Sequence, residues 1–467
     1  MHCLSTSCRL RCQLKYPNSI AALVASAVAH FDSHFAPYLA CFQSRTRSVE
    51  DAARLYLHGL FQCRRRNLEK MAETVSGSRY QRLHHMLSES AWNRSGVRRQ
   101  LIADANVHFG HASALVIDES AFAKKGDMSA GVARQWNGRL GKTDNSQVGV
   151  FAAVVRDRVA ALVEGELYIP EEWFADAARC QEAGIPEGME FCTKGEMALR
   201  MIHRLRREGV RFAHVVFDAG YGHLPWLLRA LAGERETFLA EVHSDQAIYL
   251  SDPAPAVPAR QTTKGKAPSR LQAQTPPLTA TAWAVAQPAS RWCRLSVREG
   301  EKGEVVADYL KQRVWLWDGT EQRARCWHLL VRREIGGTKL KFCLSNAKPE
   351  ASLRRLADMQ VARHFVERAF EDAKGACGMA DYQVRGWQAW HHHMALVMVA
   401  LMFLAKERLA HRETADLLSC NDLVEIMRHK LPTKIETDAD LAASIEDRHR
   451  RRQLAKDFAY KKQAAIL

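Results

Sequence analysis

Several features are scarce in this sequence, and each scarcity excludes a class of protein. The 12 cysteines are scattered through 467 residues without the spacing of a disulfide framework, which fits reduced thiols in a cytosol better than a secreted scaffold. The longest apolar run, residues 394–405 (MALVMVALMFLA), is shorter than the ~20 residues needed to cross a bilayer. The first residues, MHCLSTSCRLRCQLKYP, lack the apolar stretch of a secretory signal. We therefore expect a cytoplasmic protein with no membrane span and a buried helix at 394–405.

Charge is abundant but unbalanced. Lysine and arginine number 67 against 52 acidic residues, which gives a formal net charge of +15. This excess favours polyanionic partners, either nucleic acid or, less specifically, an anionic membrane surface. With 47% hydrophobic residues, the chain can also bury a large core, so the composition indicates a globular protein of several domains.

Hydrophobic periodicity divides the chain into five predicted parts. Residues 1–110 have helical spacing with interspersed basic groups and predict an all-helical domain that binds DNA. Residues 111–250 alternate buried strands with an amphipathic helix, which indicates an α/β core with a sheet covered on both faces. Residues 251–347 predict a β-rich insertion, 348–410 return to helices that complete the core, and 411–467 form a helical, basic tail.

The insertion begins with a stretch unfavourable to regular structure. Residues 251–290 hold half of the fourteen prolines and predict a long loop without continuous helix or central strand. The residues that follow read as β-hairpins, with Glu299-Gly300 and Gly336-Gly337 as turn signals.

Two aspartates stand at the ends of buried strands. Asp118 ends the apolar run ALVID, and Asp218 ends FAHVVFD before a glycine-containing turn. The carboxyl ends of neighbouring strands meet where α/β sheets open their ligand crevice, so the two carboxylates can lie side by side. An aspartate at such a place is more often a turn-former or helix cap, so this signal alone is weak.

A helix around residues 359–374 carries the third acidic candidate. On a helical wheel Arg363, Glu367 and Lys374 fall within about 40° of one another, along the border of an apolar face. This places Glu367 at the edge of the sheet. Three converging carboxylates repel one another unless cations intervene, and oxygen ligands select Mg²⁺ or Mn²⁺. Two ions about 4 Å apart can serve phosphoryl transfer, while Arg363 and Lys374 would hold flanking phosphates.

The spacing Arg363-x3-Glu367-x6-Lys374 resembles the Tyr-Arg-Glu-Lys signature of bacterial DDE transposases of the insertion-sequence-four superfamily. Four stretches resemble the branch that contains the insertion-sequence-seven-zero-one transposases: LVIDESAFAKKGDMSAGVARQWNGRLGKTDNSQVGVFAAV, FDAGYGHLPWLLRAL, VERAFEDAKGACGMADYQVRGWQAWHHH and LLSCNDLVEIMRHKLP. The likeness covers most of the chain after about residue 50. One departure is Gln360, which stands where the signature has tyrosine. If that tyrosine steadies a flipped or distorted DNA end in the relatives, this chain must do so in another way.

The resemblance implies an RNase H-like catalytic core interrupted by a β-strand insertion. It also implies that Asp118, Asp218 and Glu367 are the catalytic residues that bind two Mg²⁺ or Mn²⁺ ions, and that Arg363 and Lys374 contact DNA. The expected activity is metal-dependent cleavage at transposon ends, followed by transfer of the released strand into target DNA. The expected partners are terminal inverted repeats and target DNA, with a homodimer on DNA and association with the nucleoid.

Other groups have weaker signals. Five basic residues in a glycine-containing stretch after Asp118 could bind the DNA backbone or be plain solvated surface: Lys124, Lys125, Arg134, Arg139 and Lys142. The basic segment 448–463 also favours phosphate contacts. The five tryptophans of the insertion are interpreted as core residues, with stacking of an exposed one on an unpaired base as the alternative. In the run His391-His392-His393, consecutive helical residues point in different directions and cannot chelate a metal ion together, so one histidine is expected to pack the helix against the core. Cys3, Cys8 and Cys12 lack the partners of a zinc site.

Two rival interpretations remain. One is a catalytically silent DNA-binding protein derived from a transposase, against which the intact Asp118, Asp218 and Glu367 argue. The other is an RNase H-like nuclease unrelated to mobility, in which the β insertion and the paired Arg363 and Lys374 would have no obvious use.

Overall fold

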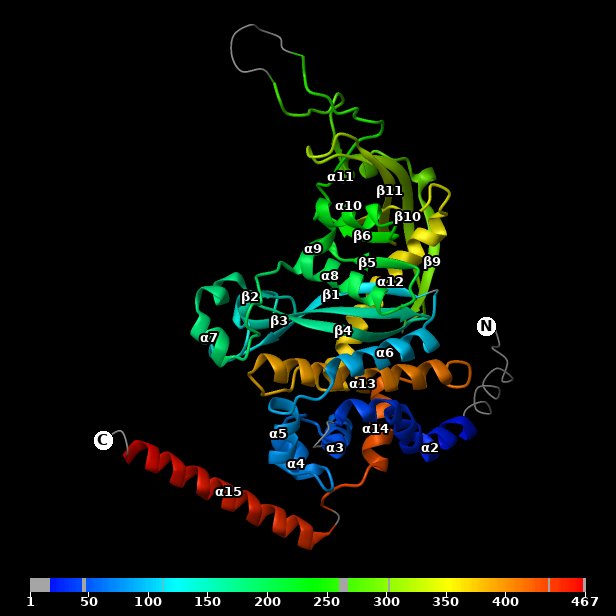
Figure 1. Ribbon diagram of the computed structural model, residues 1–467. Coiled ribbons are helices and arrows are strands. Elements are labelled where there is room, and N and C mark those ends of the chain that lie inside the picture. Colours follow the sequence, from blue (N-terminus) through cyan, green and yellow to red (C-terminus); the bar gives the residue numbers. More distant parts are fainter. Residues whose placement is uncertain are drawn as a thin grey trace.

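A ten-stranded sheet runs through the middle of the computed structural model (Figure 1), which describes residues 17–43, 48–111, 113–259, 268–300, 303–435 and 437–464. The strand order is β2-β3-β1-β5-β6-β12-β11-β10-β9, with β4 also paired to β3. The β1–β5 and β5–β6 pairs are parallel and the other pairs are antiparallel. Cys3, Cys8 and Cys12 lie outside the described residues.

The first half of the sheet contains the strands predicted from buried apolar runs. They are β1 (Ala114–Ala123), β2 (Ala133–Asn137), β3 (Lys142–Arg156), β4 (Val159–Tyr168), β5 (His214–Phe217) and β6 (Phe238–Val242). The predicted charged turn between β3 and β4 is Asp157-Arg158, with φ of 50° and 70°. Two positive φ values match the twist of a tight hairpin, so the prediction of two strands around a charged turn is confirmed.

The second half consists of β9 (Cys293–Gly300), β10 (Gly303–Leu316), β11 (Arg325–Glu334) and β12 (Leu340–Ser345). These strands confirm the predicted β-hairpins. They continue the central sheet, because β12 pairs with β6 in the register Phe342↔Val242 to Ser345↔Leu239. The division of the chain into domains stays a prediction.

The prediction of a loop throughout residues 251–290 is wrong at its end. After β7 (Ala247–Ile248), the structure has β8 (Leu278–Thr279) and α11 (Ala280–Val285), followed by the short η3 (Ala289–Arg291). Residues 278–287 contain no proline. Thr279 caps α11 by accepting a hydrogen bond from the Ala282 N–H, and Trp283 is buried against β10 and β11. A local cap and a buried anchor therefore outweigh the proline-rich surroundings.

The predicted N-terminal helices are confirmed. They are α2 (Pro17–Phe35), η1 (Ala36–Phe42), α3 (Glu50–Gln62), α4 (Leu68–Thr74), α5 (Tyr80–Ser88) and α6 (Arg94–His108). The apolar run 394–405 lies within α13 (Trp387–Ala410) and is buried, as expected, between the sheet and these helices (Figure 1). The tail is helical as α14 (Cys420–Lys430) and α15 (Asp438–Ala464), and α15 extends away from the remainder.

Helices cover both faces of the sheet. In Figure 1, α8 (Lys194–Arg207) and α10 (Pro225–Gly233) lie in front of the first strands, and α12 (Leu353–Gly375) passes behind them. Short helices fill the connections: η2 (Glu171–Ala175), α7 (Ala177–Glu182) and α9 (Ala219–Gly222). The mixed α/β class is therefore confirmed. In the described ranges, every helix is too short or too polar to cross a membrane.

Candidate active site

Asp118 and Asp218 lie side by side where the parallel pair β1–β5 ends. The register pairs Ile117 with Phe217, so the next residue on each strand is an aspartate. Asp118 accepts a hydrogen bond from the Glu119 N–H on Oδ1 (2.7 Å). Asp218 leaves the sheet as the cap of α9 and accepts from the Tyr221 N–H on Oδ1 (3.2 Å). The strand-end position predicted from the sequence brings the two carboxyl groups together.

The environment of Asp118 disfavours its charge. The side chain is buried, and burial, followed by the nearby Asp218 carboxylate, raises the pKa of Asp118 to about 7. The Arg363 guanidinium opposes this shift in part. Two adjacent carboxyl groups at a strand end, one of them desolvated, are poised to take up a proton or a cation.

The turn after Asp218 is held close to β6. A Cβ atom placed on Gly222 would lie 1.8 Å from the Glu241 carbonyl oxygen. Because that contact is impossible, any side chain at this position would push α9 away from β6. The glycine thus keeps Asp218 at its place beside Asp118.

The helix α12 brings Arg363 to these carboxylates. Its Nη1 lies 2.8 Å from Glu367 Oε1 and 3.7 Å from Glu241 Oε2, and it also interacts electrostatically with Asp118 and Asp218. Four carboxylates therefore share one guanidinium; we call Asp118, Asp218, Glu241 and Glu367 the carboxylate cluster. Glu241, on β6, was missed from the sequence because its strand contains no motif.

Glu367 and Lys374 stand on the same side of α12 as Arg363. Glu367 has 51% of its side chain exposed, whereas the Lys374 Nζ lies 5.5 Å from the Phe122 ring centre. Burial and then Arg139 lower the pKa of Lys374, while Asp118 opposes the shift. Arg363, Glu367 and Lys374, which were predicted to share one side of the helix, therefore face the ends of β1 and β5.

The three acidic candidates have the ligand chemistry that a divalent cation needs, but their carboxylates do not converge on one point. Asp118, Asp218 and Glu367 offer carboxylate oxygens of the kind that Mg²⁺ and Mn²⁺ prefer. Over the described ranges, no three acidic, histidine or cysteine side chains are close enough to hold a metal ion. The Glu367 carboxylate pairs with Arg363 at the cluster border. The structure thus brings the two aspartates together and leaves Glu367 beside them.

The basic residues after Asp118 divide into two groups. The Lys124 Nζ lies 3.4 Å from the Tyr382 ring centre, and burial lowers its pKa to about 7. Lys125, Arg134, Arg139 and Lys142 are exposed around the β2–β3 hairpin, where Lys142 pairs with Asp144 at 3.1 Å. Lys124 is therefore placed for packing and the other four for contacts from solvent.

A cavity of about 380 Å³ opens beside Asp218. Its walls include Glu119, Tyr168, Lys194 and Tyr221. The Lys194 Nζ lies 2.5 Å from Glu119 Oε2 and faces the Tyr168 ring. The Tyr221 hydroxyl is buried and has no hydrogen-bond partner in the described part of the chain. None of these residues was predicted to belong to the site, although Tyr221 lies in the segment DAGYG that follows the strand of Asp218.

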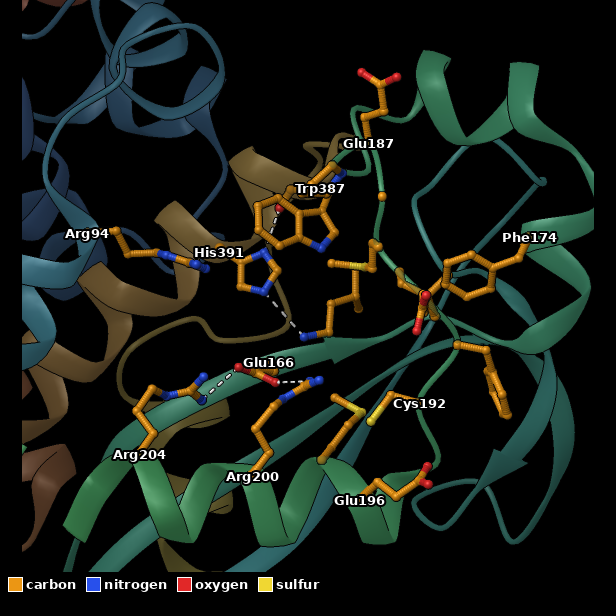
Figure 2. A pocket seen from close by; sticks show the side chains of 18 residues that line it. Arg94, Glu166, Phe174, Glu187, Cys192, Glu196, Arg200, Arg204, Trp387 and His391 are labelled. Atoms are coloured by element: carbon orange, nitrogen blue, oxygen red, sulfur yellow. Dashed lines mark hydrogen bonds and ion pairs between the residues drawn. The ribbon is translucent and has the colours of Figure 1, made fainter. Parts of the chain in front are cut away.

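A larger cavity of about 800 Å³ lies farther along β4 and α8. Figure 2 shows the Trp387 indole and the His391 ring on one side of it and Arg200 with Glu166 on the other. The His391 Nε2 accepts a 3.4 Å hydrogen bond from the Leu167 N–H. Among the charged residues that line this cavity, Glu166, Arg200 and Arg204 pair with one another.

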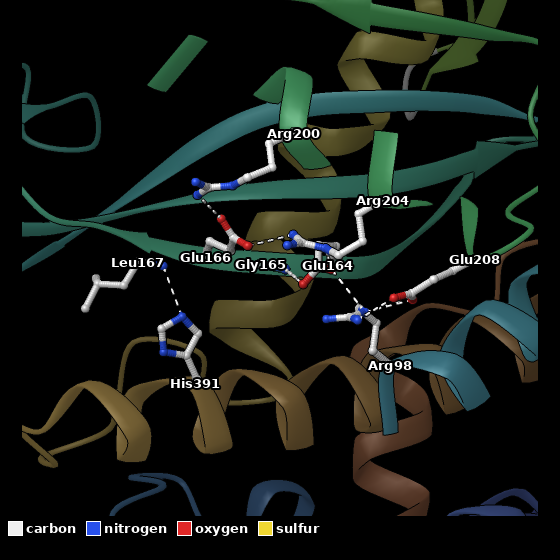
Figure 3. Close-up of polar contacts among 9 residues, drawn as sticks. All are labelled: Arg98, Glu164, Gly165, Glu166, Leu167, Arg200, Arg204, Glu208 and His391. Carbon is white, nitrogen blue, oxygen red and sulfur yellow. Dashed lines mark hydrogen bonds and ion pairs between the residues drawn. The ribbon is translucent and has the colours of Figure 1, made fainter. Parts of the chain in front are cut away.

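Those charges belong to an ion-pair cluster between β4, α6 and α8 (Figure 3). Arg204 binds Glu164 (3.0 Å) and Glu166 (2.6 Å). Three more ion pairs complete the cluster: Arg98–Glu164 (3.3 Å), Arg98–Glu208 (2.5 Å) and Arg200–Glu166 (2.9 Å). Three arginines thus balance three glutamates, and the cluster joins α6 to the sheet.

The histidine run packs within the core as predicted, and this holds for all three of its residues. All three residues of the run His391–His393 are buried, and each bonds a different neighbour: Trp387 O, Leu87 O, and the Tyr56 hydroxyl with Met379 O. Of the insertion tryptophans, Trp283 and Trp327 are buried. Gln360 is also buried and donates to Cys343 Sγ at 3.2 Å.

Comparison with known proteins decides the family. The family model of the DDE superfamily endonucleases matches residues 37–304, more than half of the chain. The chain belongs to this family. The matched residues of this DDE endonuclease contain Asp118 and Asp218 and end before α12, so the position of Glu367 comes from the helix alone.

A curated relative adds to this. The DDE endonuclease is 31% identical over 199 residues to a probable transposase for insertion sequence element IS701 from Microchaete diplosiphon. The alignment covers 42% of this chain and 49% of the relative. The chain therefore spans about half the length of the curated relative it matches. The resemblance to DDE transposases of insertion sequences is confirmed.

Proposed function

We propose that this DDE endonuclease is a transposase that cuts DNA at the ends of its own element and joins the released strand to target DNA. The observation that carries the proposal is the pair Asp118 and Asp218 at adjacent strand ends, with Arg363 and Glu367 beside them. The strand order β4-β3-β1-β5-β6, with β5 and β6 parallel to β1, supports an RNase H-like core for this site.

Asp118, Asp218 and Glu367 would hold two Mg²⁺ or Mn²⁺ ions. When bound, these ions supply Lewis acidity at the attacking and leaving oxygens of a phosphodiester. The aspartates provide a fixed part of the site, since both accept backbone hydrogen bonds. Glu367 would complete the site from α12, where its exposed carboxylate pairs with Arg363.

The basic residues would orient DNA at this site. Arg363 and Lys374 border the carboxylate cluster, where they can donate to phosphate oxygens on either side of the reacting one. Lys125, Arg134, Arg139 and Lys142 on the β2–β3 hairpin, and Lys124 once its side chain leaves Tyr382, extend this surface. The basic helix α15 offers a second DNA contact, and two element ends brought together call for a homodimer at the nucleoid.

Cleavage of a DNA duplex carrying the inverted repeats that flank the gene tests this function. With Mg²⁺, the wild type is expected to nick at the repeat junction and to join the end to a second DNA, and Glu367→Gln is expected to lower this rate at least about 10³-fold. Glu371→Gln, an exposed neighbour on α12, is the matched control and should cleave as the wild type does.

The rival functions give different results in the same assay. A catalytically silent DNA-binding protein binds the duplex with no cleavage by the wild type, which would refute the proposed activity. Equal cleavage of random DNA would instead indicate a nuclease unrelated to transposition.

A further inference from the structure

The cavity beside Asp218 lies on the opposite face of β1 from Asp118. Neighbouring residues on a strand point to opposite faces, so Glu119 and its partner Lys194 border the cavity while Asp118 faces α12. The parallel neighbour β5 ends at Phe217, and Asp218 lines the cavity directly. The cavity therefore adjoins one of the two strand-end aspartates.

An unused hydrogen-bond donor faces the same group of residues. The Tyr221 side chain is 3% exposed, and its hydroxyl has no hydrogen-bond partner in the described ranges. It interacts electrostatically with Glu119, Asp118 and Asp218. A buried hydroxyl without a partner is costly, and the cost is relieved when a ligand oxygen accepts its hydrogen bond.

The remaining walls fit a nucleotide. The Lys194 ammonium is 2.5 Å from Glu119 Oε2 and has further N–H donors that can reach a phosphate oxygen. Tyr168 and the partly exposed Trp226 offer flat aromatic faces for a base. The volume of about 380 Å³ lies in the range of small-ligand sites.

We propose that this cavity is the subsite for the nucleotide joined to the reacting phosphate, with Tyr221 donating a hydrogen bond into it and Lys194 contacting its phosphate. The proposal rests on the proposed function, because it takes the phosphodiester at Asp118 and Asp218 as the reacting group. It adds two substrate contacts on the face of the sheet away from α12.

Two variants test the contacts, each with a matched control. Tyr221→Phe removes the hydroxyl and keeps the ring, and Tyr309→Phe removes another buried hydroxyl without a described partner, on β10 far along the sheet. Lys194→Met removes the ammonium, and Lys70→Met does the same at an exposed pair with Glu73. Cleavage of the repeat-bearing duplex is expected to fall about tenfold in Tyr221→Phe and Lys194→Met and to stay unchanged in both controls.

A binding readout separates this proposal from the proposed function. Duplexes with 2-aminopurine on either side of the repeat junction are bound in EDTA, so that no cleavage is needed. For one of the two probe positions, the wild type and both controls are expected to change the fluorescence, and Lys194→Met is expected to give less than half of that change at saturating protein. A wild type that cleaves, together with Tyr221→Phe and Lys194→Met that match it in rate and fluorescence, would overturn the subsite. A wild type that gives the fluorescence change but no cleavage would refute the catalytic function alone.

Discussion

Two groups of charged side chains lie on the same sheet and differ in how their charges are matched. In the ion-pair cluster on β4, three arginines meet three glutamates at distances of 2.5 to 3.3 Å. In the carboxylate cluster, four carboxylates share Arg363. The first cluster is complete without a ligand, whereas the second has an excess of negative charge.

The difference separates structural from functional polar groups. Buried charges in a folded protein are paired as a rule, so a cluster whose carboxylates outnumber its cations is suited to bind a cation. The motif in the sequence pointed to the carboxylate cluster. The geometry favours that cluster over the balanced one on β4 as the candidate active site.

The largest expected effect comes from breaking the balanced cluster. Arg204→Met leaves Glu164, which is buried, with Arg98 as its remaining partner, and leaves Glu166 with Arg200. Loss of one partner from a buried ion pair costs about 3 to 5 kcal/mol, so urea unfolding should show a decrease of that order. The exposed Arg450→Met, which pairs with Asp447, serves as the control and should leave the stability unchanged. Addition of Glu164→Gln should restore part of the loss; an Arg204→Met protein as stable as the wild type would show that the balance is unimportant.

An intermediate effect is expected from the buried His392 of α13, which bonds the Leu87 carbonyl oxygen. Burial lowers the pKa of His392 to about 4, below the value of about 6.5 in an unfolded chain. The unfolded state therefore binds a proton first as the pH falls, and the folded state loses stability from about pH 6.5 downwards. Between pH 7.5 and pH 5, His392→Gln should lose about 2 kcal/mol less than the wild type in urea unfolding. The exposed His449→Gln is the control; equal pH dependence in all three proteins would contradict the prediction.

The smallest effect should have the opposite sign. Because burial and Asp218 raise the pKa of Asp118 to about 7, from about 4 in an unfolded chain, the metal-free fold loses stability as the pH rises through this window, and the loss is complete above it. Asp118→Asn should therefore stabilise the protein by roughly 1 to 2 kcal/mol at pH 8 in EDTA, and by less at pH 5, where the folded wild type is protonated. The exposed Asp245→Asn is the control. A loss of stability in Asp118→Asn at pH 8 would remove the contrast between the two clusters.

Local patterns predicted most of the elements near the site. Buried apolar runs located β1 and β5, and because their ends align, Asp118 and Asp218 meet as expected. Helical spacing fixes which side chains share a face. It therefore predicted that Arg363, on the same side of α12 as Glu367, lies beside the carboxylates. These predictions depend on periods of two and 3.6 residues, which a sequence displays directly.

Contacts between residues far apart in the sequence could not be predicted from such periodicity. Nothing near Val242 or Phe342 indicates that their strands pair, so the continuity of the sheet was not foreseen. Lys124 was interpreted as a DNA contact or as solvated surface, but its ammonium lies against Tyr382, more than two hundred residues later in the chain. The unmatched Tyr221 hydroxyl is likewise a property of the tertiary surroundings and has no local pattern.

The pairing of β6 with β12 has a consequence for biosynthesis. A ribosome completes β5 and β6 well before it reaches residues 340–345, so the hydrogen-bonding edge of β6 has no partner while about a hundred further residues are made. Unpaired strand edges attract other chains, and closing so long a loop is slow. The nascent chain must therefore keep β6 protected until β12 arrives, which makes the second half of the sheet a late step in folding.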